Sequence, residues 1–153
     1  MNVFISNTFT YDIGQAFLAV LKSYFKTNQL FPVNFVLGQT NDLLQLPQVA
    51  VQPGEADEEV FHTAIYRVKM AVTARTDLDV GTTSDMRQLF AAITDCFQQD
   101  TLVTQLNNTG LVVVRLVICG SQSLQEHGDR YIEKTANYEV LGYSVQSGIT
   151  ETK

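Results

Sequence analysis

The chain alternates most strictly in the stretch Ile65-Tyr-Arg-Val-Lys-Met-Ala-Val-Thr-Ala-Arg75. Successive side chains of a β-strand point to opposite faces of a sheet, so this stretch predicts a strand with two different faces. The apolar face comprises Tyr66, Val68, Met70, Val72 and Ala74, and the polar face Arg67, Lys69, Thr73 and Arg75. One apolar and one cationic face indicate an antiparallel sheet that is covered on one side only.

Two amphipathic helices flank this strand in the sequence. The first is expected at about residues 12–27, with Thr10 or Asp12 as its N-cap. Its apolar stripe comprises Ile13, Phe17, Val20, Leu21 and Tyr24. The second begins near Ser84, capped by Ser84 or Thr83, and its apolar stripe comprises Met86, Leu89, Phe90, Ile93 and Phe97. Asp100 can cap one further turn or two, which Asn107-Asn-Thr-Gly110 ends with a left-handed residue.

The remaining strands are less regular. Residues 47–52 predict an extended segment, Pro53-Gly54 a turn, and residues 55–59 an acidic loop. The β-branched run at residues 111–119 predicts a central strand, followed by a polar loop at 120–128 and a final strand at 130–145. Within residues 28–46, the stretch 43–46 is compatible either with extending a strand or with covering an edge of the core.

These elements predict one α+β domain over residues 1–146, followed by a loose C-terminal tail at 147–153. The simplest arrangement that buries the apolar face of every element is a sheet of four antiparallel strands with both amphipathic helices packed on one face. A chain of 153 residues is long enough to bury a sizeable core.

Composition excludes several classes of protein. The net charge of −6 disfavours general nucleic-acid binding, which needs a dense basic patch. No signal peptide and no run of apolar residues long enough to span a bilayer is expected, so the protein is predicted to be soluble and to stay where it is made. Cys96 and Cys119 lack a CxxC partner and predict two buried, reduced thiols in a reducing compartment.

The search for reactive groups identifies few candidates. His62 lies four residues after Glu58, and His127 lies in the charged stretch 126–129. Metal sites usually need three or four convergent ligands, so the interpretation of either histidine as a structural or loop residue is favoured. No nucleophile motif or phosphate-binding loop is present. We therefore expect no catalysis, no cofactor and no metal. The alternative is a small-molecule or metal-binding α+β domain that uses His62, His127 and nearby carboxylates.

The polar strand face is the strongest positive feature. Arg67, Lys69 and Arg75 share one side of their strand, and Arg115 can join them if its strand pairs nearby. Either this is an ordinary solvated face or it is a contact surface for an acidic neighbour or for nucleic acid passing close by. The acidic residues that could complement it in a second copy are Glu55, Asp57, Glu58 and Glu59. A basic face and an acidic loop on one subunit suit head-to-tail packing into a ring.

The order and character of these segments resemble the tail terminator and tail completion (neck) proteins of tailed bacteriophages. The resemblance rests on the first helix, on Leu46-Pro-Gln-Val-Ala-Val-Gln-Pro-Gly54, on Ile65-Tyr-Arg-Val-Lys-Met-Ala-Val-Thr73 and on the helix at 85–99. The strand at 111–119 and Asn137-Tyr-Glu-Val-Leu-Gly-Tyr143 complete it.

The resemblance implies a non-catalytic virion protein that is assembled in the host cytoplasm and forms a homo-oligomeric ring, as a hexamer. It implies tail-tube or head-connector proteins as neighbours, passing contact with DNA in a channel, and no membrane partner. It leaves the position in the particle open between terminator and connector.

Overall fold

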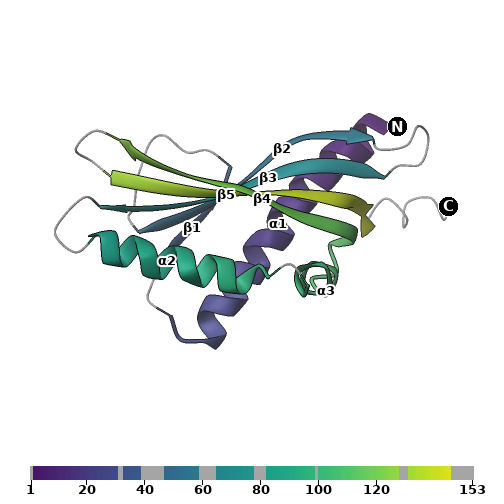
Figure 1. Cartoon of the computed structure of the whole chain (residues 1–153). Coiled ribbons are helices and arrows are strands. Elements are labelled where there is room, and N and C mark those ends of the chain that lie inside the picture. The colour runs from purple at the N-terminus through teal and green to yellow at the C-terminus, as the bar shows by residue number, and fades with distance from the viewer. Residues whose placement is uncertain are drawn as a thin grey trace.

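The computed structural model describes residues 2–30, 33–38, 47–58, 65–77, 82–98, 100–127 and 131–145. These residues form three helices and five strands (Figure 1). In chain order the elements are α1 (Asn2–Thr27), β1 (Asn34–Leu37), β2 (Gln48–Glu58), β3 (Tyr66–Asp77), α2 (Thr82–Cys96), α3 (Leu102–Asn107), β4 (Val112–His127) and β5 (Tyr131–Ser144). The predicted α+β class is confirmed, whereas the predicted strand number is wrong.

The strands form a single mixed sheet in the order β1-β2-β3-β5-β4. β1 pairs with β2 in parallel, and the other three pairs are antiparallel. The expectation of four purely antiparallel strands missed β1, which has only four residues, Asn34-Phe-Val-Leu37, none of them fully buried. So short a strand cannot show the alternation by which strands are recognised in a sequence.

The three described helices lie on the same side of the sheet, and none of them covers its other face, which we call the open face (Figure 1). The predicted apolar face of β3 lies under the helices, since Val68, Val72 and Ala74 have no exposed surface. An aromatic cluster joins the layers: the ring centroid of Phe17 of α1 lies 5.1 Å from that of Phe97 and 5.8 Å from that of Tyr138 of β5. The two-layer arrangement predicted from the sequence is therefore correct.

Helix α1 begins at Asn2 rather than near residue 12. Thr10 and Asp12 lie inside it and do not cap it; Asp12 is buried and accepts a hydrogen bond of 2.5 Å from the Ser144 hydroxyl of β5. The upstream turns pack against the core through Phe9, which is fully buried and stacks on Tyr66 at 6.3 Å. Tertiary packing thus extends the helix beyond the stretch with clear periodicity.

Strand β2 continues through Pro53-Gly54, where a turn was expected. The register of β2 against β3 shifts between Pro53 and Ala56, and β1 pairs only as far as Val51. A proline without an N–H is tolerated in a strand at such an irregularity and beyond the end of its neighbour. The backbone of residues 55–58 is consequently strand and not loop, while Glu59 lies outside the described residues.

Strand β4 occupies the edge of the sheet and not its centre. It also runs through residues 120–127, which were expected to form a loop. Register shifts between Val114 and Leu116 and between Cys119 and Gln122 interrupt its alternation. Such bulges explain why the apolar run resembles a strand buried on both faces, although part of it is exposed. The final strand, β5, was predicted correctly.

The second predicted helix is confirmed, because all five residues of its apolar stripe are buried. It begins at Thr82, so Thr83 and Ser84 are helical and not caps. α3 is capped at its N-terminus by Thr101, without a side-chain hydrogen bond, and not by Asp100. Its C-cap Asn108 is right-handed, and Gly110 is the residue that adopts a positive φ of 78°.

None of the described helices is long and apolar enough to cross a membrane. The predicted tail at 147–153 and the stretch 43–46 lie outside the described residues.

Candidate interaction surface

The open face of the sheet carries two ion pairs between β3 and β5. Arg67 donates from Nη1 to Glu139 Oε1 at 3.0 Å, and Arg75 donates from Nε to Glu133 Oε1 at 3.0 Å. Arg75 also donates from Nη1 to Gln48 Oε1 of β2 at 2.7 Å, which joins three neighbouring strands. The predicted polar face of β3 therefore exists, but two of its three cations are paired with carboxylates of the same molecule.

The two ion pairs differ in their exposure to solvent. The side chains of Arg75 and Glu133 are 13% and 16% exposed, whereas those of Arg67 and Glu139 are 35% and 34% exposed. Between the ion pairs, the hydroxyls of Thr73 and Thr135 lie 2.9 Å apart. Lys69 is exposed and lies opposite Glu139 in the register. The face is thus of mixed charge. Of the three basic residues that β3 places on it, Lys69 is exposed, whereas Arg67 and Arg75 are partly buried.

Arg115 lies on β4, which β5 separates from β3. It is exposed and sits at the register shift between Val114 and Leu116. Leu116 and Arg67 both pair with Leu141 of β5, so Arg115 lies near the same level of the sheet as Arg67. It belongs to the same end of the sheet without being a direct strand neighbour of the other basic residues.

The acidic residues lie on the other side of β3. Asp57 of β2 pairs with Arg67, and Glu58 pairs with Tyr66. Glu55 belongs to the irregular part of the strand, and only the backbone of these acidic residues is described. The acidic segment and Arg67 are therefore neighbours within one molecule, which the sequence did not indicate.

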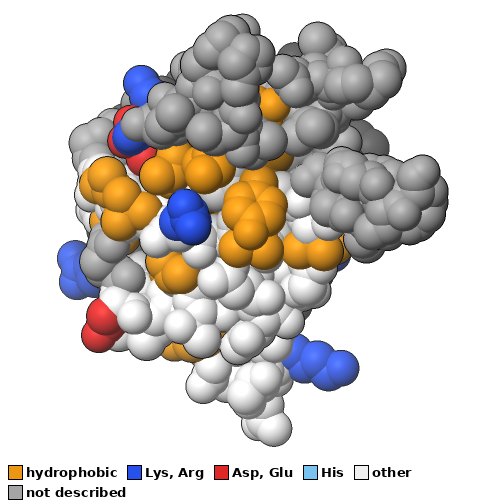
Figure 2. Space-filling model, turned by 90° about the vertical axis from the view of Figure 1, so that its right-hand side faces the viewer, with side chains coloured by type: hydrophobic (Ala, Val, Ile, Leu, Met, Phe, Trp, Pro, Cys, Tyr) orange, Lys and Arg blue, Asp and Glu red, His pale blue; other side chains and the backbone are white. Residues whose placement is uncertain are grey.

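The edge strand β4 exposes large apolar side chains. Leu116 is 45% exposed and Ile118 is 44% exposed. Opposite them in the register lie Leu141 and Glu139 of β5. Figure 2 views the end of the sheet at which β4 begins, and it shows apolar side chains gathered beside a basic one. A long strand edge with exposed leucine and isoleucine is a template for pairing with another chain.

The residues proposed for metal binding are placed as follows. His62 lies outside the described residues, and His127 is the last residue of β4, where only its backbone is described. Within the described ranges there is no group of three or more His, Cys, Asp or Glu side chains that could hold a metal ion.

The cysteines differ from each other. Cys96 is buried as predicted and contacts the Val20 carbonyl at 3.8 Å, and burial raises the pKa of its thiol to about 12. Cys119 is exposed, contrary to the prediction, although partial burial raises the pKa of its thiol too. Its exposure follows from its place on the edge strand beside the second register shift.

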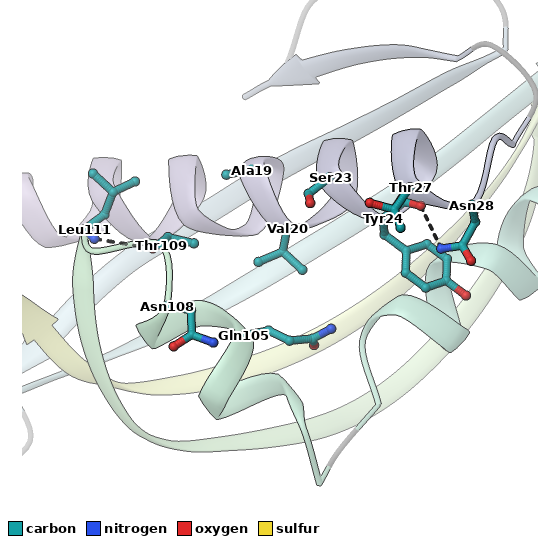
Figure 3. Close-up of a pocket in the computed structure, with 10 residues that line it drawn as sticks. All are labelled: Ala19, Val20, Ser23, Tyr24, Thr27, Asn28, Gln105, Asn108, Thr109 and Leu111. Carbon is teal, nitrogen blue, oxygen red and sulfur yellow. Dashed lines mark hydrogen bonds between the residues drawn. The ribbon is translucent and has the colours of Figure 1, made fainter.

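A groove that the sequence did not reveal lies between the C-terminal half of α1 and the turn that follows α3 (Figure 3). Its volume is about 610 Å³. It is lined by Ala19, Val20, Ser23, Tyr24, Thr27, Asn28, Gln105, Asn108, Thr109 and Leu111. The Oε1 atom of Gln105 is buried and has no hydrogen-bond partner in the part of the chain that is described. Because α3 has only six residues, its contribution to a groove is hard to recognise in the sequence.

No family model matches the chain, and no curated protein matches it. Among solved structures, a chain of the virion of a native gene transfer agent particle is similar, with a TM-score of 0.47 and 12% sequence identity. The match covers 92% of this chain and 96% of that chain.

Proposed function

We propose that this chain is a structural protein of a tailed-phage virion, which forms a ring at the head-proximal end of the tail as a tail terminator or neck component. The observation that carries the proposal is the surface of the sheet: the described helices all lie on one face, and the edge strand β4 exposes Leu116 and Ile118. In this proposal the protein has no catalytic activity and acts through its surfaces. We assign the protein to a phage particle because its sequence resembles the tail terminator and neck proteins of tailed bacteriophages.

The physical basis is the behaviour of strand edges. A strand at the edge of a sheet presents backbone groups that can pair with another chain, and monomeric proteins usually blunt such edges with charges, prolines or short strands. β4 has 16 residues, and its segment Val112–Cys119 contains only one charged residue, Arg115. An edge of this kind suits a subunit that is completed by its neighbours.

The charges of the open face support the same role. Because Arg67 and Arg75 are paired with Glu139 and Glu133, the face can approach another protein surface without strong repulsion. The protein carries a net charge of −6, which opposes tight binding of nucleic acid. A ring through which DNA passes benefits from weak contacts, and Lys69 and Arg115 are the exposed cations through which we propose contact with a neighbour or with passing DNA.

The test is the location of the protein in particles. Particles produced from the genome that encodes this chain would be labelled with a gold-conjugated antibody against it and imaged. We expect gold at the junction of head and tail, next to the tail-tube and head-connector proteins. Particles that contain no copy of the chain, or that carry the label elsewhere, would overturn the assignment to the terminator or neck.

A second candidate function, a small-molecule-binding domain, is favoured by the groove between α1 and α3. The Gln105 side chain lines this groove and extends toward Tyr24, and its buried Oε1 has no hydrogen-bond partner among the described residues (Figure 3). Ligands that bind only the folded state raise its melting temperature.

Thermal shift measurements can test this second candidate with two probes, benzamide for the groove and Zn²⁺ for His62 and His127. A rise with benzamide that Gln105→Leu abolishes would support a ligand site. A rise with Zn²⁺ that His62→Ala or His127→Ala abolishes would support a metal site. Unchanged melting temperatures with both probes would oppose this candidate.

A further inference from the structure

We infer that a patch on the open face of the sheet in one copy of this chain packs against the junction of α2 and α3 in the next copy. The inference rests on the proposed ring and identifies the surfaces that join its subunits. It commits to a second copy of this chain as the occupant of the patch. The patch consists of three apolar and two basic residues: Leu116, Ile118, Leu141, Lys69 and Arg115.

The register of the sheet places the apolar residues of the patch on the open face. Val140 of β5 has no exposed surface and points to the helices, so its neighbours Glu139 and Leu141 point to the open face. Leu116 pairs with Leu141, and Ile118 pairs with Glu139. Because residues that pair across strands share a face, Leu116 and Ile118 lie on the open face as well. Exposed apolar side chains gathered in this way are typical of an interaction surface.

Two exposed cations flank these apolar side chains. Lys69 pairs with Glu139, which pairs with Ile118, so one row across the sheet joins Lys69 to Ile118. Arg115 directly precedes Leu116 in β4. Both cations are exposed, and neither forms an ion pair within the described ranges. Since the whole chain carries −6, the rest of the molecule without these two charges carries −8. The patch is therefore a positive region on an acidic protein.

The junction of α2 and α3 carries the opposite charge. Asp95 lies in the last turn of α2, and Asp100 directly precedes Thr101, the N-cap residue of α3. Both carboxylates are exposed, and neither is in an ion pair with another residue that the structure describes. The last turn of α2 contains no basic residue, so Asp95 lies uncompensated near the negative end of the helix dipole. A cation supplied by another copy would relieve this repulsion.

The two surfaces lie on opposite sides of the molecule, the patch on the open face and the junction in the helix layer (Figure 1). Their contact therefore stacks the sheet of one copy on the helices of the next and covers Leu116 and Ile118. Like charges disfavour a contact of patch with patch or of junction with junction. Unlike charges thus select a head-to-tail contact, and such contacts generate closed rings when the rotation between subunits closes.

The test uses complementary charge reversal. Lys69→Glu with Arg115→Glu gives the patch the charge of the junction, and Asp95→Lys with Asp100→Lys gives the junction the charge of the patch. Alone, each double variant is expected to dissociate at concentrations at least tenfold higher than the wild type, as measured by light scattering over a dilution series. Mixed in equal amounts, the two variants have opposite charges at every contact between unlike chains and are expected to form assemblies of alternating subunits.

The control reverses two charges outside both surfaces. Lys22→Glu with Lys26→Glu makes the same change in net charge at exposed positions of α1 and should assemble like the wild type. If this control dissociates as readily as Lys69→Glu with Arg115→Glu, the effect comes from net charge and the inference is overturned. It is also overturned if the two patch and junction variants, each shown to be folded by circular dichroism, do not assemble when mixed.

A second measurement covers the case in which a double variant does not fold. Leu116→Ser removes an apolar side chain from the patch without a change of charge, and Leu116→Met keeps an apolar side chain there. Because Leu116 is 45% exposed, neither substitution empties the core. Leu116→Ser is expected to dissociate at concentrations at least tenfold higher than the wild type, and Leu116→Met at those of the wild type. Assembly of Leu116→Ser like the wild type overturns the inference and leaves the ring intact. A wild-type chain that stays monomeric overturns both the contact and the ring.

Discussion

The two ion pairs on the open sheet face should contribute unequally to stability, and this difference can be measured with two matched substitutions. Glu133→Gln and Glu139→Gln each remove one carboxylate charge while keeping a side chain of nearly the same size. Arg75 and Glu133 are 13% and 16% exposed, so Glu133→Gln leaves a guanidinium largely excluded from solvent without its counter-charge. Arg67 and Glu139 are 35% and 34% exposed, so water can solvate Arg67 after Glu139→Gln.

The magnitudes follow from these exposures. Removing one partner of a fully buried pair costs about 3–5 kcal/mol, and hydrogen bonds to charged groups contribute about 1.5–3 kcal/mol. Because Gln48 still accepts from Arg75 at 2.7 Å, we expect Glu133→Gln to lower the free energy of unfolding by about 2–3 kcal/mol. Exposed pairs contribute about 0.2–1 kcal/mol, and Glu139→Gln should cost no more than that.

Urea unfolding followed by circular dichroism measures both values. With a urea dependence of about 2 kcal/mol per molar, the midpoint should fall by about 1–1.5 M for Glu133→Gln and by less than about 0.5 M for Glu139→Gln. The measurement should be made at low concentration, where the chain is dissociated, because assembly also stabilises the folded state. Equal costs for the two substitutions, or a larger cost for Glu139→Gln, would refute the reasoning from burial.

Three further predictions concern the core, a glycine and the response to pH. Phe17→Ala should cost about 3–5 kcal/mol, seen as a lower urea midpoint, because Phe17 is fully buried against Phe97 and Tyr138; a cost below about 1 kcal/mol would contradict that packing. Gly142→Ala should cost about 1–3 kcal/mol in the same assay, since its Cβ would meet the Val113 carbonyl and come within 2.9 Å of Val114 Cα, and an unchanged midpoint would show that the backbones are farther apart. Stability should fall as pH rises from 9.0 to about 12, because the unfolded chain releases the Cys96 proton while burial keeps the folded thiol protonated; Cys96→Ala should show a smaller fall, and an identical pH dependence would contradict this assignment.

The sequence predicts the two-layer arrangement because the strongest periodicities belong to elements with one buried face. The alternation of β3 and the stripe of α2 were interpreted correctly, since Val68 and Val72 of β3 and Leu89 and Ile93 of α2 have no exposed surface. The same regularity identified β5. These elements face a single core, and one face of each must be apolar for that reason.

The errors occur where the sheet departs from regular geometry. Pro53-Gly54 resembles a turn, but it lies at a register shift inside β2. Two further shifts in β4 conceal its alternation, so an edge strand resembled a central one. A bulge changes the side on which later residues point, and a sequence gives no local signal for it.

The candidate surface was only partly predictable. Placement of Arg67, Lys69 and Arg75 on one strand face follows from a period of two and was correct. Their partners were not predictable, because Glu133 and Glu139 approach β3 only through the pairing of strands more than fifty residues apart in sequence. The exposure of Leu116 and Ile118 depends likewise on the position of β4 at the edge, which only the strand order determines.

Light scattering on the purified wild-type chain, with negative-stain imaging of the same fractions, tests the central claim of ring assembly most directly. The account predicts closed rings with a mass of six times the 17.1 kDa of one chain. It also predicts that this mass decreases on dilution through dissociation of head-to-tail contacts. A single species with the mass of one chain, at every concentration up to the solubility limit, would contradict the account.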